Sequence, residues 1–131
     1  MERLKERIEV AFRALITLEQ VLQESAPRKV VRDAAIQRFE YTVEAAWKAA
    51  QRYLQEVEGL RSGSPKGVVR ACFQVGLLSE EESELALQIM DDRNLTVHTY
   101  NEPLAEALFA RLPEHARLIR QWLERLTARV Q

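Results

Sequence analysis

The segment Arg93-Asn94-Leu95-Thr96-Val97-His98-Thr99-Tyr100 gathers side chains that could do chemistry on a phosphodiester. Histidine titrates near neutral pH and can carry a proton. Arginine keeps its charge, and its fork matches phosphate oxygens. Asn94 could orient the imidazole or hydrogen-bond a ribose hydroxyl. A single histidine is more often structural than catalytic, but this grouping is rarer, so we treat Arg93, Asn94 and His98 as candidate catalytic residues.

The helix that positions this segment is expected to start after Ser79 and to run to about 97–100. Ser79 and Glu82 have the spacing of a capping box. On a wheel of about 100° per residue, Arg93 falls within an apolar face and Tyr100 falls within about 20° of it. A guanidinium there is costly unless it is paired or lines a polar cavity. We expect Glu40 or Glu44 of the preceding long helix as its partner if the pairing is structural. The apolar face consists of Leu85, Ala86, Ile89, Met90 and Val97.

A second side of the same helix is also polar. Asn94 and His98 are four residues apart and should stack, with Asp91 one turn earlier and Leu87 exposed beside them. A helix with two such faces often meets a second subunit or frames a cleft. This pattern indicates a dimer interface or a cleft and makes Asp91 a candidate contact to a partner or nucleotide.

The preceding helix has a related polar line at Tyr41, Glu44 and Lys48. One interpretation is a solvated face with a partly exposed tyrosine. The other is that these three residues contribute to the same cleft or contact a partner or nucleotide.

Metal and cofactor chemistry is not indicated. His98 has no histidine or carboxylate at zinc-site spacing, and His115 lies far along the chain. No glycine-rich phosphate loop is present, so nucleoside triphosphate hydrolysis is not expected. The single cysteine, Cys72, is predicted to be a buried helix residue. We therefore predict neither a metal nor a cofactor.

The rest of the chain reads as helix in a single domain, residues 1–131. Helices are expected over 2–23, 29–58, from Pro65 to Gly76, from Ser79 onward and over 103–128, with a kink or short break at Pro113. The buried side of the second helix is expected to extend to Val57. The predicted fold class is an all-α, up-and-down bundle of four to five helices.

Composition limits the class of protein and the compartment in which we expect it. Apolar residues make up 47% of the chain and charged residues 30%, as in ordinary folded proteins. No apolar run approaches the ~20 residues that span a bilayer, the first residues are too charged for a signal peptide, and one cysteine suits a reducing compartment. We expect a cytoplasmic protein without membrane contact. The net charge of −1 means that any RNA contact needs a local patch.

The motif resembles the R-x4-H-x-Y signature of the HEPN (higher eukaryote and prokaryote nucleotide-binding) family. Two further stretches are similar to its nucleotidyltransferase substrate-binding branch, namely residues 38–48 (RFEYTVEAAWK) and residues 64–78 from Ser-Pro to Gly-Leu-Leu. The resemblance covers nearly the whole chain. It implies a helical dimer that is paired with a minimal nucleotidyltransferase in a toxin–antitoxin-like system.

The resemblance also implies roles for the motif residues. Arg93 would stabilise charge on a scissile RNA phosphate, and His98 would act as general acid or base of a metal-independent endoribonuclease. Tyr100 would be the acceptor of AMP from the partner enzyme, which would silence the site. Because members of this branch differ in activity, a non-catalytic nucleotide- or substrate-binding adaptor and a purely structural helical dimer remain alternatives.

Overall fold

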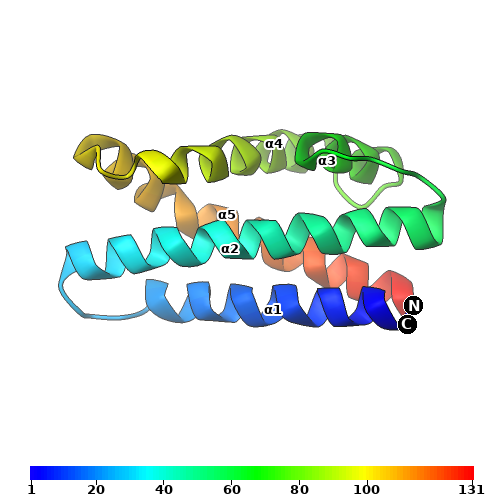
Figure 1. Ribbon diagram of the computed structural model, residues 1–131, viewed down its shortest axis with the longest axis horizontal. Helices are drawn as coiled ribbons and strands as arrows, with labels where there is room; N and C mark the ends of the chain where they lie inside the picture. The colour runs from blue at the N-terminus through cyan, green and yellow to red at the C-terminus, as the bar shows by residue number, and fades with distance from the viewer.

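The computed structural model describes residues 1–131 and contains five α-helices and no strands (Figure 1). A π-helical turn, Leu54–Glu58, extends α2, and a 3-10 turn, Thr96–His98, follows α4. The predicted all-α bundle is therefore confirmed. The helices are α1 (Glu2–Leu22), α2 (Arg28–Tyr53), α3 (Pro65–Gln74), α4 (Glu80–Leu95) and α5 (Glu102–Val130).

The helices pack around α2. In Figure 1, α1 lies antiparallel beside α2, α3 and α4 lie along its other side, and α5 crosses behind it. The two chain ends meet at one end of the bundle. The three largest fully buried side chains are Phe39 and Tyr53 of α2 and Trp122 of α5. None of the helices combines the length and the apolar character that crossing a membrane requires.

Side-chain caps fix three helix starts. Ser64 accepts a hydrogen bond from the Gly67 amide at the start of α3. Asn101 accepts one from the Leu104 amide at the start of α5. Ser79 and Glu82 form the predicted capping box of α4. These contacts satisfy amide groups that have no partner within the helix, so the starts are encoded locally.

One expected helix feature is wrong, and for a second the structure excludes a break and leaves a kink. The regular part of α2 ends at Tyr53, and the π-helical turn that follows leaves Val57 42% exposed instead of buried. α5 continues through Pro113 without the expected break. Pro113 lies on the exposed side of α5, where a freed carbonyl and a bend can be accommodated. Cys72 is buried as predicted, and its burial raises the pKa of the thiol to about 12.

The capping carboxylate of α4 also joins this helix to α5. Arg125 donates two hydrogen bonds to Glu82, of 2.7 and 2.8 Å, and these lower the pKa of Glu82 to about 2 from its ordinary 4.5. A carboxyl group with a lowered folded-state pKa stabilises the protein above its unfolded pKa and loses that effect as pH falls.

As pH falls from roughly 4.5 to 2, we therefore expect the loss of the Glu82–Arg125 interaction to lower the free energy of unfolding by about 1–2 kcal/mol. Urea denaturation of the wild type and Glu82→Gln across this range measures the effect. Glu80→Gln, which replaces an exposed carboxylate of the same turn, is the matched control. The prediction fails if Glu82→Gln and the wild type lose stability in parallel over this range.

Candidate functional site

Arg93 lies near the end of α4 and reaches toward α2. Its Nη2 is 2.9 Å from Oε1 of Glu44, and the side chain remains one-third exposed. The Nε atom of Arg93 is buried and has no hydrogen-bond partner. The expectation of a glutamate partner from the second helix is thus confirmed for Glu44. Because one end of the guanidinium is still accessible, this pairing leaves Arg93 able to meet a ligand.

His98 and Tyr100 lie on the segment after α4, outside the helix. The expected helix to residues 97–100 is wrong, because α4 ends at Leu95 and a 3-10 turn follows. Val97 and Tyr100 are 69% and 81% exposed, so they do not share an inward face with Arg93. Nδ1 of His98 is 3.3 Å from the Tyr100 hydroxyl, and the two rings meet edge to face. The structure therefore presents an imidazole and a phenol together to solvent.

Threonine side chains explain why α4 stops. The hydroxyl of Thr96 donates to the Arg93 carbonyl at 2.7 Å and also lies 3.1 Å from Oε2 of Glu40. The Thr99 hydroxyl donates to the Thr96 carbonyl. Hydroxyls that bond nearby carbonyls compete with the helical pattern, and β-branched residues are weak helix formers. Glu40, the other predicted partner of Arg93, instead anchors the turn that carries His98.

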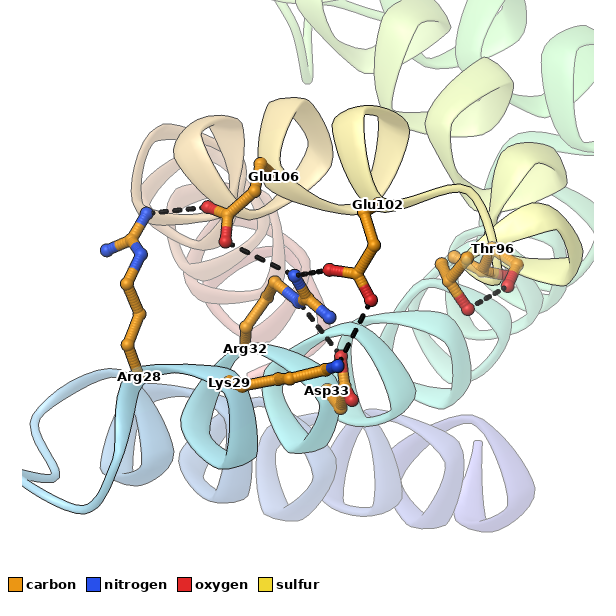
Figure 2. Close-up of polar contacts among 8 residues, drawn as sticks. Arg28, Lys29, Arg32, Asp33, Thr96, Glu102 and Glu106 are labelled. Atoms are coloured by element: carbon orange, nitrogen blue, oxygen red, sulfur yellow. Dashed lines mark hydrogen bonds and ion pairs between the residues drawn. The ribbon is translucent and has the colours of Figure 1, made fainter.

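The segment is held at its far end by a cluster of charges that the sequence did not indicate. Figure 2 shows Arg32 of α2 between Glu102 and Glu106 of α5, with the hydrogen bonds from its Nη1 measuring 2.7 and 3.2 Å. Arg32 is only 3% exposed. Hydrogen bonds to Glu102, and then to Asp33, raise the pKa of the guanidinium further. α2 therefore contacts the chain before the 3-10 turn through Glu44, within the turn through Glu40 and after it through Arg32.

Asn94, Asp91 and Leu87 do not form the predicted second face. Because the helix ends at Leu95, Asn94 and His98 are not stacked on one helix. Asp91 is exposed and pairs with Lys66 of α3 at 2.6 Å. Leu87 is partly buried and packs against the core instead of being exposed. Asn94 lies beside Arg93 in a pocket between α2, α3 and α4.

The polar line on α2 touches the motif at one residue. Glu44 binds Arg93 through Oε1 and lies 3.6 Å from Lys48 Nζ through Oε2. Tyr41 is 42% exposed and shares a 2.7 Å hydrogen bond with Thr17 of α1. All three line a pocket of about 540 Å³ between α1 and α2, which also includes Arg3. Of the two interpretations of this line, a contribution to the motif's surroundings is supported for Glu44.

A buried ionic cluster lies behind the motif. Asp92 is 2% exposed and accepts two hydrogen bonds from Arg111, of 2.8 and 2.9 Å. Oδ2 of Asp92 is also 2.7 Å from Nε2 of the buried His115. Burial acts to raise the pKa of Asp92, but the hydrogen bonds from Arg111 and His115 outweigh it and lower the pKa. The sequence separates these residues too widely for their contact to be recognised.

No group of three or more His, Cys, Asp or Glu side chains is arranged to hold a metal ion. The motif offers a guanidinium, an imidazole, an amide and a phenol. These are groups that bind phosphate, transfer protons or accept an acyl or phosphoryl group.

A sequence model of proteins described as "Nucleotidyltransferase substrate binding protein like" matches residues 6–128. The chain belongs to this family. The match confirms the HEPN branch that the motif and the two flanking stretches indicate. It spans all five helices, the Glu44–Arg93 pair and the His98–Tyr100 turn.

Individual relatives of the family agree with this assignment. A protein of Thermus thermophilus is 61% identical, with a TM-score of 0.85 over 88% of this chain and 98% of its own. The probable ribonuclease HepT of Haemophilus influenzae is 28% identical over an alignment of 125 residues, which covers 84% of this chain and 84% of its own. The tri-AMPylated Shewanella oneidensis HEPN toxin, solved in complex with an MNT antitoxin, shares the fold at 17% identity. Its TM-score is 0.77, over 95% of this chain and 96% of its own.

Proposed function

We propose that this chain is the HEPN-type partner subunit of a minimal nucleotidyltransferase in a toxin–antitoxin-like pair. In this proposal it carries a metal-independent ribonuclease site at Arg93 and His98, which AMP transfer to Tyr100 silences. Family membership and the ribonuclease name of the Haemophilus influenzae relative support the general role. The observation that carries the specific proposal is the exposed contact between His98, five residues beyond Arg93, and Tyr100.

The proposed cleavage uses the 2′-hydroxyl of RNA as the nucleophile. The 2′-oxygen forms a bond to phosphorus, the bond from phosphorus to the 5′-oxygen breaks, one proton leaves the 2′-hydroxyl and one reaches the 5′-oxygen. His98 carries one of these protons, because an imidazole nitrogen can accept or donate a proton in the transition state. Arg93 stabilises the charge that builds on the phosphorane oxygens. For this, Arg93 contacts phosphate in addition to Glu44 or in exchange for it.

A homodimer would complete the site. Two proton transfers need two groups, and one exposed turn offers a single imidazole. A second copy with its own Arg93 and His98 facing the first would supply the second acid or base. The exposed apolar side chains of Val97 and Tyr100 next to His98 favour a contact of this kind. In this arrangement a monomer would bind RNA without cleaving it efficiently.

AMP on Tyr100 would block this chemistry directly. The Tyr100 oxygen would attack the α-phosphorus of ATP, pyrophosphate would leave, and the phenolic proton would pass to a base. Because the hydroxyl lies 3.3 Å from His98 Nδ1, the new phosphate would occupy the position where a scissile phosphate must bind. Its negative charge would also repel an incoming RNA strand. With 81% of Tyr100 exposed, the partner's active site could reach the hydroxyl without unfolding the helix end.

Co-expression with the nucleotidyltransferase encoded beside it tests the pairing. We expect the two proteins to co-purify and intact-mass spectrometry to detect one or more adenylyl groups, with Tyr100 among the modified residues. Tyr100→Phe should abolish the modification at this position, because phenylalanine has no acceptor oxygen. Tyr41→Phe is the matched control, since Tyr41 is the other exposed tyrosine. Failure to co-purify, or adenylylation that is unchanged in Tyr100→Phe, would overturn the proposal.

The non-catalytic adaptor is the second candidate. It is favoured by the engagement of Arg93 with Glu44 in the free chain and by the absence of a net positive charge. It predicts a stable complex with the nucleotidyltransferase and no RNA cleavage by the separated subunit. The cleavage experiment below distinguishes the two.

A further inference from the structure

A pocket of about 290 Å³ opens beside Arg93, where α2, the start of α3 and the end of α4 converge. Its size is near the lower limit of the ~300–1,000 Å³ that is usual for small-ligand sites, which suits one nucleotide. The side chains that matter for its chemistry are Glu44, Trp47, Lys66, Met90, Arg93 and Asn94.

The pocket and the motif share a carboxylate oxygen. Oε1 of Glu44 accepts a hydrogen bond from the indole Nε1 of Trp47 at 3.1 Å and lies 2.9 Å from Arg93 Nη2. A ligand that shifts the indole therefore acts on the same oxygen that holds the guanidinium. This links occupancy of the pocket to the placement of the motif arginine.

The side chains around the pocket combine the groups that bind a ribonucleotide. Trp47 is only partly buried, and an accessible aromatic ring is a stacking surface for a base. Asn94 is exposed and its side chain makes no hydrogen bond within the chain, so its side-chain amide is free to meet a base edge or a ribose hydroxyl. Lys66 and Arg93, which are paired with Asp91 and Glu44 in partly exposed ion pairs, provide positive charge for phosphates. A buried methionine, Met90, forms apolar surface between them.

We propose that the Trp47 pocket binds one nucleotide of the RNA strand next to the scissile phosphate and thereby determines which nucleotide is accepted there. The base stacks on Trp47, Asn94 hydrogen-bonds the nucleotide, and Lys66 contacts a flanking phosphate. This rests on the proposed ribonuclease function, and it adds a binding site to the residues of the R-x4-H-x-Y motif. Asn94 becomes a substrate-binding residue that distinguishes nucleotides.

The larger pocket between α1 and α2 is a weaker candidate for a base. Its tyrosine hydroxyl is already bonded to Thr17, and two glutamates stand among its basic residues. It also lacks a direct contact with the motif other than Glu44.

The chain's own tryptophans allow a direct test. It has two, and Trp122 is 1% exposed in the core, so Trp122→Phe leaves Trp47 as the only emitter. The probe is a 2′-O-methyl tetranucleotide, which cannot be cleaved by its own 2′-oxygen, titrated beside the four free 5′-mononucleotides. We expect saturable quenching of Trp47 by the tetranucleotide, tighter than by any mononucleotide because neighbouring phosphates also bind.

Variants of the pocket should weaken this binding. Asn94→Ala and Lys66→Ala should each raise the dissociation constant of the tetranucleotide about fivefold or more. Lys5→Ala, at a pocket between α1 and α5, is the matched control and should leave it unchanged. If Trp122→Phe does not fold, acrylamide quenching of the wild type reports Trp47, because acrylamide does not reach the buried Trp122. Protection of Trp47 by the tetranucleotide is then the expected result.

The outcomes separate this inference from the proposed function. Binding at Trp47 without any RNA cleavage supports the pocket and overturns the ribonuclease proposal. Cleavage of RNA without a response of Trp47 overturns the pocket proposal alone. The pocket proposal is also overturned if the mononucleotides bind as tightly as the tetranucleotide. If the fluorescence of Trp47 changes with protein concentration but not on addition of nucleotide, the pocket is an interface between two copies, and the proposal is overturned as well.

Discussion

RNA cleavage by the purified protein should fall about 10²- to 10⁴-fold when His98 is replaced by alanine, because general acid–base catalysis contributes about that much to such reactions. The proposed mechanism assigns one proton transfer to His98, whose imidazole is exposed and has the Tyr100 hydroxyl as its hydrogen-bond partner. Arg93→Ala should reduce the rate by a comparable factor through lost charge stabilisation. Initial rates on a fluorescent RNA oligonucleotide measure both effects.

Controls for this experiment come from the chain itself. Arg61→Ala removes an exposed arginine from the loop before α3 and should leave the rate unchanged. Cleavage by the wild type should persist in excess EDTA, because the proposed steps use only side chains and the RNA. Cleavage that survives in the double variant Arg93→Ala/His98→Ala would come from another site or a contaminant and would contradict the assignment.

The second large effect is on stability. Asp92→Ala should lower the free energy of unfolding by about 3 kcal/mol, the lower end of the range for breaking a buried ion pair, because Asp92 is buried whereas Arg111 keeps about one-third of its side chain exposed. Arg111 would lose two hydrogen bonds, and the buried His115 would lose its only hydrogen-bond partner. Urea denaturation followed by circular dichroism gives the midpoint and the slope that this comparison requires.

The neighbouring residue is a matched control. Asp91 is exposed and makes one surface ion pair with Lys66, so Asp91→Ala should change stability by no more than about 1 kcal/mol. If Asp91→Ala and Asp92→Ala destabilise the protein equally, the buried cluster is not what stabilises this part of the bundle. Asp92→Asn should fall between them, since it keeps the shape and loses the charge.

Much of the fold could be predicted because its determinants are local. Ser64 and Ser79 cap helices within three residues of themselves, so their hydrogen bonds follow from the sequence. A guanidinium next to an apolar stripe needs a counter-charge, so the sequence predicts Glu40 or Glu44 as the partner of Arg93. In the structure Glu44 pairs with Arg93, and Glu40 instead accepts a hydrogen bond from Thr96. α2 was expected to continue as a regular helix to Glu58, and no local signal marks the π-helical turn.

By itself the sequence determined the helical class, most helix starts and the identity of the R-x4-H-x-Y residues, since these depend on residue type and short spacing. Only the tertiary structure decided how the turn after α4 is anchored and how the motif faces solvent. The decisive contact joins Thr96 to Glu40, 56 residues away, and a periodicity argument contains no such information. The same holds for Asp92, whose partners on α5 are 19 and 23 residues distant. Packing α4 against α5 removes all three side chains, wholly or in part, from water, and a charged or polar group there is costly without a partner, so the packing decides the pairing.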